Sequence, residues 1–246
     1  MGEENDPMGI SIVTGASRGL GRALAAGLAS RGWSLVIDAR GAEALSGAEA
    51  ELQPLMRPGA RLVAIAGDVT DPKHRQSLAG AAHALGGLDL LVNNAGILGP
   101  SPLPKLHVYP LDGLRDVIEV YVVAALGLIQ ETIAMLRAAP SGGRILMVTS
   151  DASVEAYEGW GGYGAAKAAV DQLARVLAVE EPTLHVWAVD PGDLRTFMHQ
   201  QAFPGEDISD RPEPDAVVPA IIGLIESNRQ SGRVRAAELV ANSVAP

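Results

Sequence analysis

The sequence predicts an α/β fold in which one doubly wound parallel sheet of about seven strands carries helices on both faces. Short runs of consecutive apolar residues, many of them β-branched, recur along the 246-residue chain. Such runs are typical of strands that are buried on both faces. Stretches rich in Ala and Leu, long enough for helices, separate the runs. Because strand and helix alternate about six times, the strands are expected to lie parallel in one sheet.

Seven segments are the candidate strands, and the last of them is the weakest. In chain order they are Ile10–Thr14, Leu35–Ala39, Arg61–Ala66, Leu88–Asn93, Arg144–Thr149, Leu184–Val189 and a region near Val234–Val240. Most are apolar at consecutive positions rather than at alternate ones, which indicates central strands of a covered sheet.

The clearest helices are Gly19–Arg31, Leu114–Arg137 and Tyr163–Glu180, which are rich in Ala, Leu and other helix-forming residues. Two Pro-rich stretches, Gly99–Pro110 and Phe203–Pro219, are expected to be surface loops. Loops that follow the carboxyl ends of strands line the ligand crevice of a doubly wound sheet. Both stretches are therefore candidate substrate loops, with plain connections as the alternative.

The chain shows no internal repeat and no linker that would divide it, and its length is ordinary for one α/β domain. Residues 9–246 are expected to form a single domain, with a substrate loop at about residues 194–214. Residues 1–8 are mostly polar and acidic, unlike a signal peptide, and are expected to be a flexible N-terminal stub.

The composition excludes several functional classes. The formal net charge is −10, which disfavours nucleic acid and anionic membranes as partners. No segment approaches the run of about 18 apolar residues that spans a bilayer. The absence of cysteine excludes disulfides and a thiol nucleophile, and the five histidines lack metal-ligand spacing, so no metal site is expected. A cytoplasmic protein is expected.

A glycine-rich loop lies directly between the first strand and the first helix. It reads TGASRGLG over residues 14–21, with glycines at 15, 19 and 21. Glycines there permit positive φ and a close approach of the backbone to a pyrophosphate, which the helix N-terminus stabilises. The position of the loop between strand and helix favours dinucleotide binding over a simple turn.

This loop resembles the TGxxxGxG motif of the short-chain dehydrogenase/reductase family, and further motifs follow in the order of that family across almost the whole chain. They are Asp68-Val69, NNAG at 93–96, YGAAK at 163–167 with Ser150 thirteen residues ahead, and PGDLRT at 191–196. The resemblance implies a Rossmann fold with strand order 3-2-1-4-5-6-7. It also implies a homodimer or homotetramer built through the two long helices.

The resemblance implies a nicotinamide dinucleotide, with its pyrophosphate over the glycine loop. The residues implied to bind it are Gly15, Ser17, Arg18, Gly19, Leu20, Gly21, Arg40, Asp68, Val69, Asn94, Ala95, Gly96, Tyr163, Lys167, Pro191, Gly192, Leu194 and Thr196. The implied catalytic residues are Ser150, Tyr163 and Lys167, and Tyr157 and Trp160 are candidates for the substrate pocket or for packing.

Elementary chemistry supports those catalytic roles. Reduction of a ketone needs a proton donor, and lowering a tyrosine pKa from about 10 to about 7 takes about 4 kcal/mol. One cation at about 4 Å supplies a similar energy at an effective dielectric of about 20. Tyr163 and Lys167 are spaced i, i+4 and share one helix face, so Lys167 is expected to lower the pKa of Tyr163. Ser150 is expected to donate a hydrogen bond to the substrate carbonyl oxygen.

The sequence departs from the family at one catalytic position. Members usually carry an Asn in the long fourth helix that holds a water for proton relay, and the alignment puts Tyr121 there. The favoured hypothesis is that Ser150, Tyr163 and Lys167 remain active without that Asn. The alternative is a catalytically weak or silent dinucleotide-binding sensor or scaffold.

The choice of cofactor depends on the end of the second strand. Asp38 lies 23 residues after Gly15, and an acid there would bind the ribose hydroxyl of NAD. Counting in the frame of the family instead places Arg40 at the position that binds the 2′-phosphate of NADP, with Arg18 as a second cation. The sequence therefore favours NADP, with NAD as the alternative.

The sequence as a whole predicts an NADP-preferring carbonyl reductase or alcohol dehydrogenase (EC 1.1.1.-) that acts on a small ketone or secondary alcohol. A methyltransferase also has a glycine-rich first loop, but the YxxxK motif and the missing acid in frame after the second strand count against that class.

Overall fold

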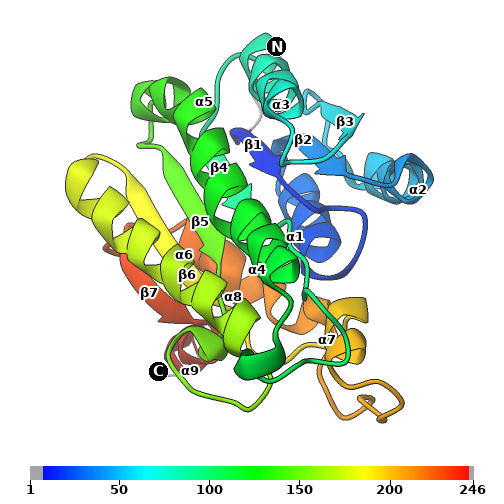
Figure 1. Cartoon of the computed structure of the whole chain (residues 1–246). Helices are drawn as coiled ribbons and strands as arrows, with labels where there is room; N and C mark the ends of the chain where they lie inside the picture. Colours follow the sequence, from blue (N-terminus) through cyan, green and yellow to red (C-terminus); the bar gives the residue numbers. More distant parts are fainter. Residues whose placement is uncertain (1–7, 244–246) are drawn as a thin grey trace, which may run out of the picture.

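Seven parallel strands form one sheet in the order β3-β2-β1-β4-β5-β6-β7, so the doubly wound sheet and its predicted order are confirmed (Figure 1). The computed structural model describes residues 8–243. The strands are β1 (Ile10–Val13), β2 (Ser34–Ala39), β3 (Leu62–Ala66), β4 (Leu90–Asn93), β5 (Arg144–Val148), β6 (His185–Asp190) and β7 (Gly232–Arg235). The predicted stub at residues 1–8 lies outside the described residues except for Met8.

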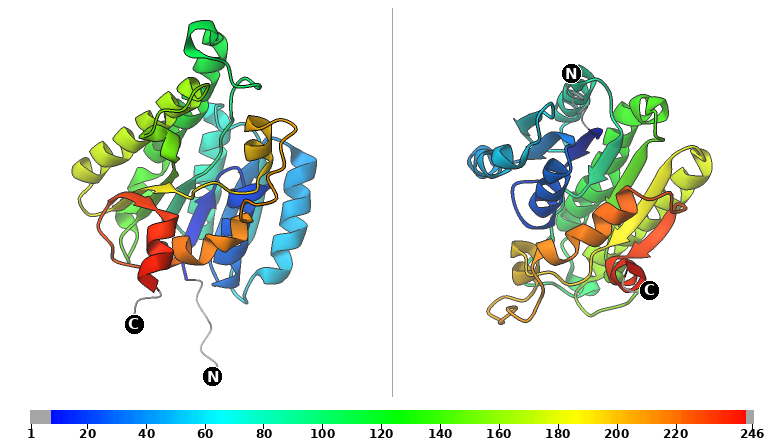
Figure 2. Two further views of the ribbon diagram at one scale, coloured as in Figure 1. Left: turned by 90° about the horizontal axis from the view of Figure 1, so that it is seen from below. Right: turned by 180° about the vertical axis from the view of Figure 1, so that it is seen from behind.

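Helices cover both faces of the sheet, as Figure 2 shows. One layer contains α1 (Gly19–Ser30), α2 (Ala42–Leu52), α8 (Val218–Ile225) and α9 (Ala236–Ser243). The opposite layer contains α3 (Pro72–Leu85), α4 (Leu111–Ile118), α5 (Ala125–Ala138) and α6 (Gly161–Glu180). A short helix, α7 (Phe197–Ala202), lies outside these layers at the carboxyl edge of the sheet.

Successive strand residues supply the two cores. Ile12 packs in the core beneath α3, α5 and α6, whereas Val13 packs in the core beneath α1 and α8. Side chains of a strand point alternately to opposite faces, so a sheet covered on both sides needs apolar residues at every position. This requirement explains the continuous apolar runs of the sequence.

The structure corrects the boundaries of two predicted segments. The seventh strand is Gly232–Arg235, and most of the predicted segment Val234–Val240 belongs to α9 instead. The Ala-Ala-Glu-Leu sequence that follows Arg235 is a better helix former than strand former. The Pro-rich stretch Phe203–Pro219 is a loop only in its first part. Its last part contains the 3-10 turn η5 (Pro214–Ala216) and the start of α8.

The long predicted helix Leu114–Arg137 begins earlier and is not uniform. It runs from Leu111 to Ala138 as α4, a π-helical turn η3 (Glu119–Ala124), and α5. By length and composition alone it could cross a membrane, although such a test is also passed by core helices of soluble proteins. Here it packs against α3, α6 and the sheet. Single π-helical turns occur frequently at functional sites.

Candidate active site

A cavity of about 1030 Å³ lies at the carboxyl edge of the sheet. Here β1 and β4 are adjacent, and the connections from their ends run to opposite faces. Such a switch point is where open α/β sheets bind ligands. Every residue that the sequence analysis proposed for the cofactor or for catalysis lines this cavity. The structure therefore brings the whole predicted set together, while their individual roles stay predictions.

The glycine loop has the geometry needed to approach a phosphate. Gly15 and Gly19 have φ values of +67° and +56°, which favour glycine. A Cβ on Gly21 would lie 2.3 Å from Nδ2 of Asn94 and 2.4 Å from the carbonyl oxygen of Gly15. Arg18, the N-cap of α1, caps no backbone N–H with its side chain. The free N–H groups and the close backbone therefore fit the pyrophosphate of a dinucleotide.

Gly21→Ala is expected to weaken binding of NADPH about tenfold or more, because the added methyl group must displace Asn94 or the Gly15 carbonyl. Overpacking of this kind costs about 1–3 kcal/mol, and every 1.4 kcal/mol is about tenfold in affinity. A fluorescence titration with NADPH measures the effect. Gly47→Ala is the matched control, since nothing lies within 4 Å of its Cβ position in α2, and it should bind NADPH like the wild type. Equal binding by both variants would contradict the assigned role of Gly21.

Asp38, the candidate NAD-selecting acid, contacts other residues of the fold with both carboxylate oxygens. Its side chain is buried, Oδ1 accepts from the backbone N–H of Gly15 at 2.7 Å, and Oδ2 pairs with Nε2 of His74 at 2.9 Å. His74 fits because Gly67 has no side chain, as a Cβ there would lie 2.2 Å from Nδ1 of His74. This carboxylate holds the glycine loop in place. Arg40, two residues later, is exposed and lines the cavity.

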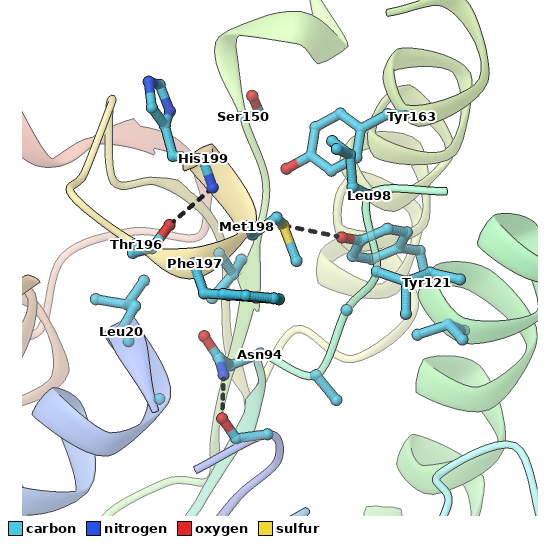
Figure 3. A pocket seen from close by; sticks show the side chains of 18 of the residues that line it. Leu20, Asn94, Leu98, Tyr121, Ser150, Tyr163, Thr196, Phe197, Met198 and His199 are labelled. Carbon is cyan, nitrogen blue, oxygen red and sulfur yellow. Dashed lines mark hydrogen bonds between the residues drawn. The ribbon is translucent and has the colours of Figure 1, made fainter. Parts of the chain in front are cut away.

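The three proposed catalytic residues come from two elements that end at the cavity. Ser150 follows β5, and its hydroxyl donates to Oδ1 of Asp151 at 2.9 Å. Tyr163 and Lys167 lie one turn apart on α6, and both are buried. Nζ of Lys167 donates to the carbonyl oxygen of Val148 at 2.7 Å. Figure 3 shows Ser150 and Tyr163 at the same end of the pocket.

Burial dominates the protonation of both α6 side chains. It raises the pKa of Tyr163 well above its usual value, while hydrogen bonds from Ser150 and Tyr121 act to lower it. Burial lowers the pKa of Lys167 to about 7, against the opposing attraction of Asp171 and Asp190. The groups that lower the pKa of Tyr163 are thus two hydroxyls, and the expected effect of Lys167 on it stays a prediction.

Tyr121 lies on the π-helical turn η3 and points into the site. Its ring is edge-on to that of Tyr163, with 5.6 Å between centroids. Its hydroxyl donates to Sδ of Met198 at 3.8 Å, as Figure 3 shows. Nζ of Lys167 lies 3.8 Å from the centroid of its ring. The side chain at the unusual position thus contacts both proposed catalytic residues of α6.

The segment predicted as a substrate loop contains α7, which sequence reasoning did not foresee. Thr196 caps this helix by accepting from the backbone N–H of His199 at 3.1 Å. Phe197 covers the guanidinium of Arg18 at 4.8 Å. An N-cap threonine is a signal that could have located this helix.

Part of the cavity lining is aromatic. Trp160 is 5.5 Å from Tyr163 and 6.1 Å from Phe203, measured between ring centroids. Tyr157 also lines the cavity, and its hydroxyl lies 2.9 Å from Asp151. The two residues that the sequence left between a pocket role and packing therefore border the pocket.

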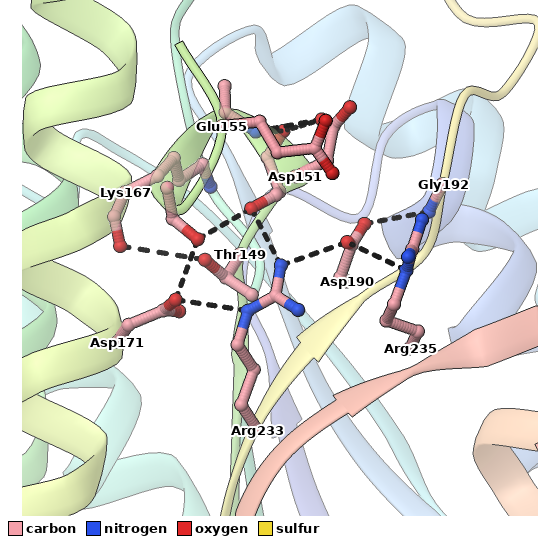
Figure 4. Close-up of polar contacts among 12 residues, drawn as sticks. Thr149, Asp151, Glu155, Lys167, Asp171, Asp190, Gly192, Arg233 and Arg235 are labelled. Carbon is pink, nitrogen blue, oxygen red and sulfur yellow. Dashed lines mark hydrogen bonds and ion pairs between the residues drawn. The ribbon is translucent and has the colours of Figure 1, made fainter. Parts of the chain in front are cut away.

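The partly buried Arg233 joins three segments of the chain, as Figure 4 shows. Arg233 of β7 donates to Oδ2 of Asp171 at 3.1 Å, to Oδ2 of Asp190 at 3.0 Å and to the carbonyl oxygen of Ser150 at 3.0 Å. Oδ1 of Asp190 accepts from the backbone N–H of Gly192 at 3.0 Å. Sequence reasoning missed Arg233 because the seventh strand was expected to start after it.

Comparison with known proteins identifies relatives of the chain. A family model described as short chain dehydrogenase matches residues 10–207. Sepiapterin reductase of Rattus norvegicus is 35% identical over 202 residues, which cover 78% of this chain and 77% of that protein.

Solved structures agree. A Shigella flexneri protein assigned as a short chain dehydrogenase, complexed with NADP, superposes with a TM-score of 0.86 at 27% identity and covers 96% of this chain and 100% of that one. The alcohol dehydrogenase of the archaeon Thermococcus sibiricus, complexed with 5-hydroxy-NADP, gives a TM-score of 0.81 at 25% identity and covers 92% and 95% of the two chains.

Proposed function

We propose, because this chain belongs to the short-chain dehydrogenase family, that it is an NADP-dependent carbonyl reductase that interconverts a ketone and a secondary alcohol. The single observation that carries the proposal is the convergence of Ser150, Tyr163 and Lys167 on one cavity with the glycine loop. The oxidoreductase family follows from the matched model, and the reaction type is the proposal.

The bound cofactor supplies the hydride, and the residues of the chain supply the proton and the charge stabilisation. Tyr163 gives its phenolic proton to the carbonyl oxygen as that oxygen gains negative charge. Ser150 turns its hydroxyl from Asp151 to the same oxygen and stabilises the developing charge. Lys167 supplies positive charge beside the tyrosine and binds the nicotinamide ribose. In the direction of alcohol oxidation, Tyr163 must first be a phenolate.

The aromatic wall of Trp160, Phe203 and Tyr157 favours a substrate with a flat ring beside its carbonyl group. A relative named sepiapterin reductase supports a reductase activity for this chain. The turn before α5 exposes Val123, and α6 exposes Val176 and Val179, which supports a homo-oligomer formed through the two long helical segments.

The surroundings of Asp38 and of Arg40 support NADP over NAD. Both carboxylate oxygens of Asp38 already make contacts within the fold, with Gly15 and His74, so a ribose hydroxyl would compete with the contacts that hold the glycine loop. Arg40 lies exposed at the same end of the cavity, where a guanidinium fits a 2′-phosphate. NADP complexes of two solved relatives point in the same direction.

Arg40→Ala is expected to weaken NADPH binding about tenfold and to leave NADH binding within about twofold, since a charge-assisted hydrogen bond contributes about 1.5–3 kcal/mol and exposure reduces it. Parallel fluorescence titrations of the wild type and the variant measure both affinities. Arg22→Ala is the control, because Arg22 is an exposed arginine of α1 that pairs with Glu51 and does not line the cavity. Tighter binding of NADH than of NADPH by the wild type would overturn the NADP assignment.

A silent sensor or scaffold is the second candidate, and the observation that favours it is Tyr121 at the position of the usual Asn. Such a protein would bind NADPH without turning over a panel of ketones and aldehydes. The contacts of Tyr121 with Lys167 and Tyr163 favour the enzyme instead.

A further inference from the structure

Tyr121 is the one aromatic side chain, among residues 8–243, that contacts both Tyr163 and Lys167. It is 5% exposed, and it comes from the π-helical turn that interrupts the long helix. A Cβ on Gly96 would lie 2.4 Å from the Tyr121 hydroxyl, so the ring occupies space that only a glycine at this position leaves open. Its placement is therefore closely determined by the backbone around it.

The ring of Tyr121 compensates a buried charge. Nζ of Lys167 lies 3.8 Å from the ring centroid, within the range of a cation–π interaction, which is strongest where water is excluded. The hydrogen-bond partner of Nζ is the carbonyl oxygen of Val148. The nearby carboxylates of Asp171 and Asp190 each accept from Arg233. The π-face of Tyr121 is thus the close partner that favours the ammonium form of Lys167.

The hydroxyl of Tyr121 is positioned to act on Tyr163. The two rings are edge-on with 5.6 Å between their centroids, and hydrogen bonding between their side chains acts to lower the pKa of Tyr163 and to raise that of Tyr121. The backbone of Ile97 acts in the opposite sense and lowers the pKa of Tyr121, although burial dominates and raises it. The Tyr121 hydroxyl donates to Sδ of Met198 at 3.8 Å, and because a thioether sulfur is a weak acceptor, this proton is available to a stronger oxygen acceptor.

We propose that Tyr121 is a positioning residue for the proton transfer, whose ring stabilises the ammonium group of Lys167 and whose hydroxyl donates to Tyr163 and favours its phenolate. The catalytic consequence rests on the proposed function, whereas the effect on Lys167 is a property of the folded chain. In this proposal Tyr121 stabilises Lys167 in place of the Asn that the family usually carries, and the enzyme keeps its activity.

Other polar and charged groups surround Tyr163 and Lys167 and also affect their pKa values. They are Asp151 from η4 (Asp151–Ser153), Asp171 from α6, Asp190 from β6, and Ser150, Arg233 and Arg235 behind them. None of these side chains is altered by a substitution at Tyr121, so a change in either pKa reports on Tyr121 itself.

Two variants separate the ring from the hydroxyl. Tyr121→Phe keeps the ring and removes the donor, and Tyr121→Leu removes both. Tyr109→Phe is the matched control, because Tyr109 is also a buried tyrosine but does not line the cavity. Circular dichroism and an NADPH titration verify that each variant is folded.

The first readout is the pKa of Lys167, measured by NMR titration of the lysine side-chain amines. The chain has three lysines, and Lys105 is well exposed, so the buried amine of Lys167 is identified with a Lys167→Met spectrum. Loss of a desolvated cation–π contact is expected to lower its pKa by about one unit in Tyr121→Leu. Tyr121→Phe and Tyr109→Phe should stay within about 0.3 unit of the wild type. An unchanged value in Tyr121→Leu would overturn the role of the ring.

The second readout is the pH profile of kcat/KM for oxidation of 1-phenylethanol with NADP. Tyr163 must be a phenolate for this reaction, so loss of the donor in Tyr121→Phe should move the acid limb to higher pH by about one to two units. At high pH the kcat/KM of Tyr121→Phe should approach that of the wild type, whereas a purely structural defect would lower kcat/KM at every pH. An acid limb that stays in place in Tyr121→Phe would overturn the role of the hydroxyl.

If the wild type oxidises no alcohol, the pKa of Tyr163 is instead followed by NMR of tyrosines labelled at Cζ, of which the chain has four. Ionisation of Tyr163 at the same or a lower pH in Tyr121→Phe than in the wild type would then reject the hydroxyl role. In that case the proposed function fails by itself, while the NMR measurements still decide the role of Tyr121.

Discussion

Tyr163→Phe is expected to lower kcat/KM for ketone reduction by about 10²–10⁴-fold, which is the usual contribution of general acid catalysis. The hydroxyl is the proposed proton donor, and it lies at the same end of the pocket as Ser150. The phenyl ring that remains still packs against Trp160 and Tyr121, so the fold is kept. Steady-state kinetics over a panel of aryl ketones with NADPH measures the effect.

Two controls make this result interpretable. NADPH affinity should change less than about threefold, because the lost interaction is made mainly in the transition state. Tyr109→Phe removes a buried hydroxyl outside the cavity and should keep wild-type turnover. Equal turnover by Tyr163→Phe and the wild type would reject the proposed chemistry. Turnover by neither, with NADPH still bound by both, would favour the silent sensor.

Arg233→Met is expected to have the largest effect on stability, lowering the free energy of unfolding by about 3–5 kcal/mol, as removal of one partner from a buried ion pair does. The carboxylates of Asp171 and Asp190 are 4% and 3% exposed, and both lose their guanidinium partner together with the carbonyl oxygen of Ser150. Arg235 contacts Asp190 only at 3.9 Å and is half exposed, so it does not replace Arg233. Urea unfolding followed by circular dichroism measures the change.

Arg22→Met provides the comparison. Arg22 pairs with Glu51 at 2.9 Å, but the side chains are 46% and 61% exposed. Exposed pairs contribute about 0–1 kcal/mol, so this variant should unfold close to the wild type. Adding Asp171→Asn and Asp190→Asn to Arg233→Met should recover part of the loss, because neutral amides are less costly to bury unpaired than carboxylates. Equal destabilisation by Arg233→Met and Arg22→Met would refute the buried role of Arg233.

The architecture could be predicted because its signals are local. A strand covered on both faces needs mostly apolar residues, and Ile10–Val13 and Leu35–Ala39 carry that pattern in the sequence itself, with Ser11 and Asp38 as the polar exceptions. The glycine loop is equally local, since positive φ at Gly15 and Gly19 requires residues without a Cβ. The seventh strand is short and partly exposed, so its pattern was weak and its boundary was misplaced.

The partners of charged residues could not be predicted, because they come from distant parts of the chain. Asp38 looks like a ribose ligand from its distance to Gly15, and only the packing of α3 shows that His74 occupies its second oxygen. Arg233 lies 62 residues from Asp171 and 83 from Ser150, and no spacing rule connects them.

Sequence by itself determined the doubly wound sheet and the glycine loop, since each depends on backbone conformation or burial that a short segment encodes. The strand order and the residues that line the cavity followed from the resemblance of the motifs to those of the family. Tertiary structure alone decided what those side chains touch. It put the ring of Tyr121 against Lys167 and beside Tyr163, and it paired Asp38 with Gly15 and His74. Contact energies and pKa values depend on neighbours within a few ångströms, and the fold brings those neighbours together from separate segments.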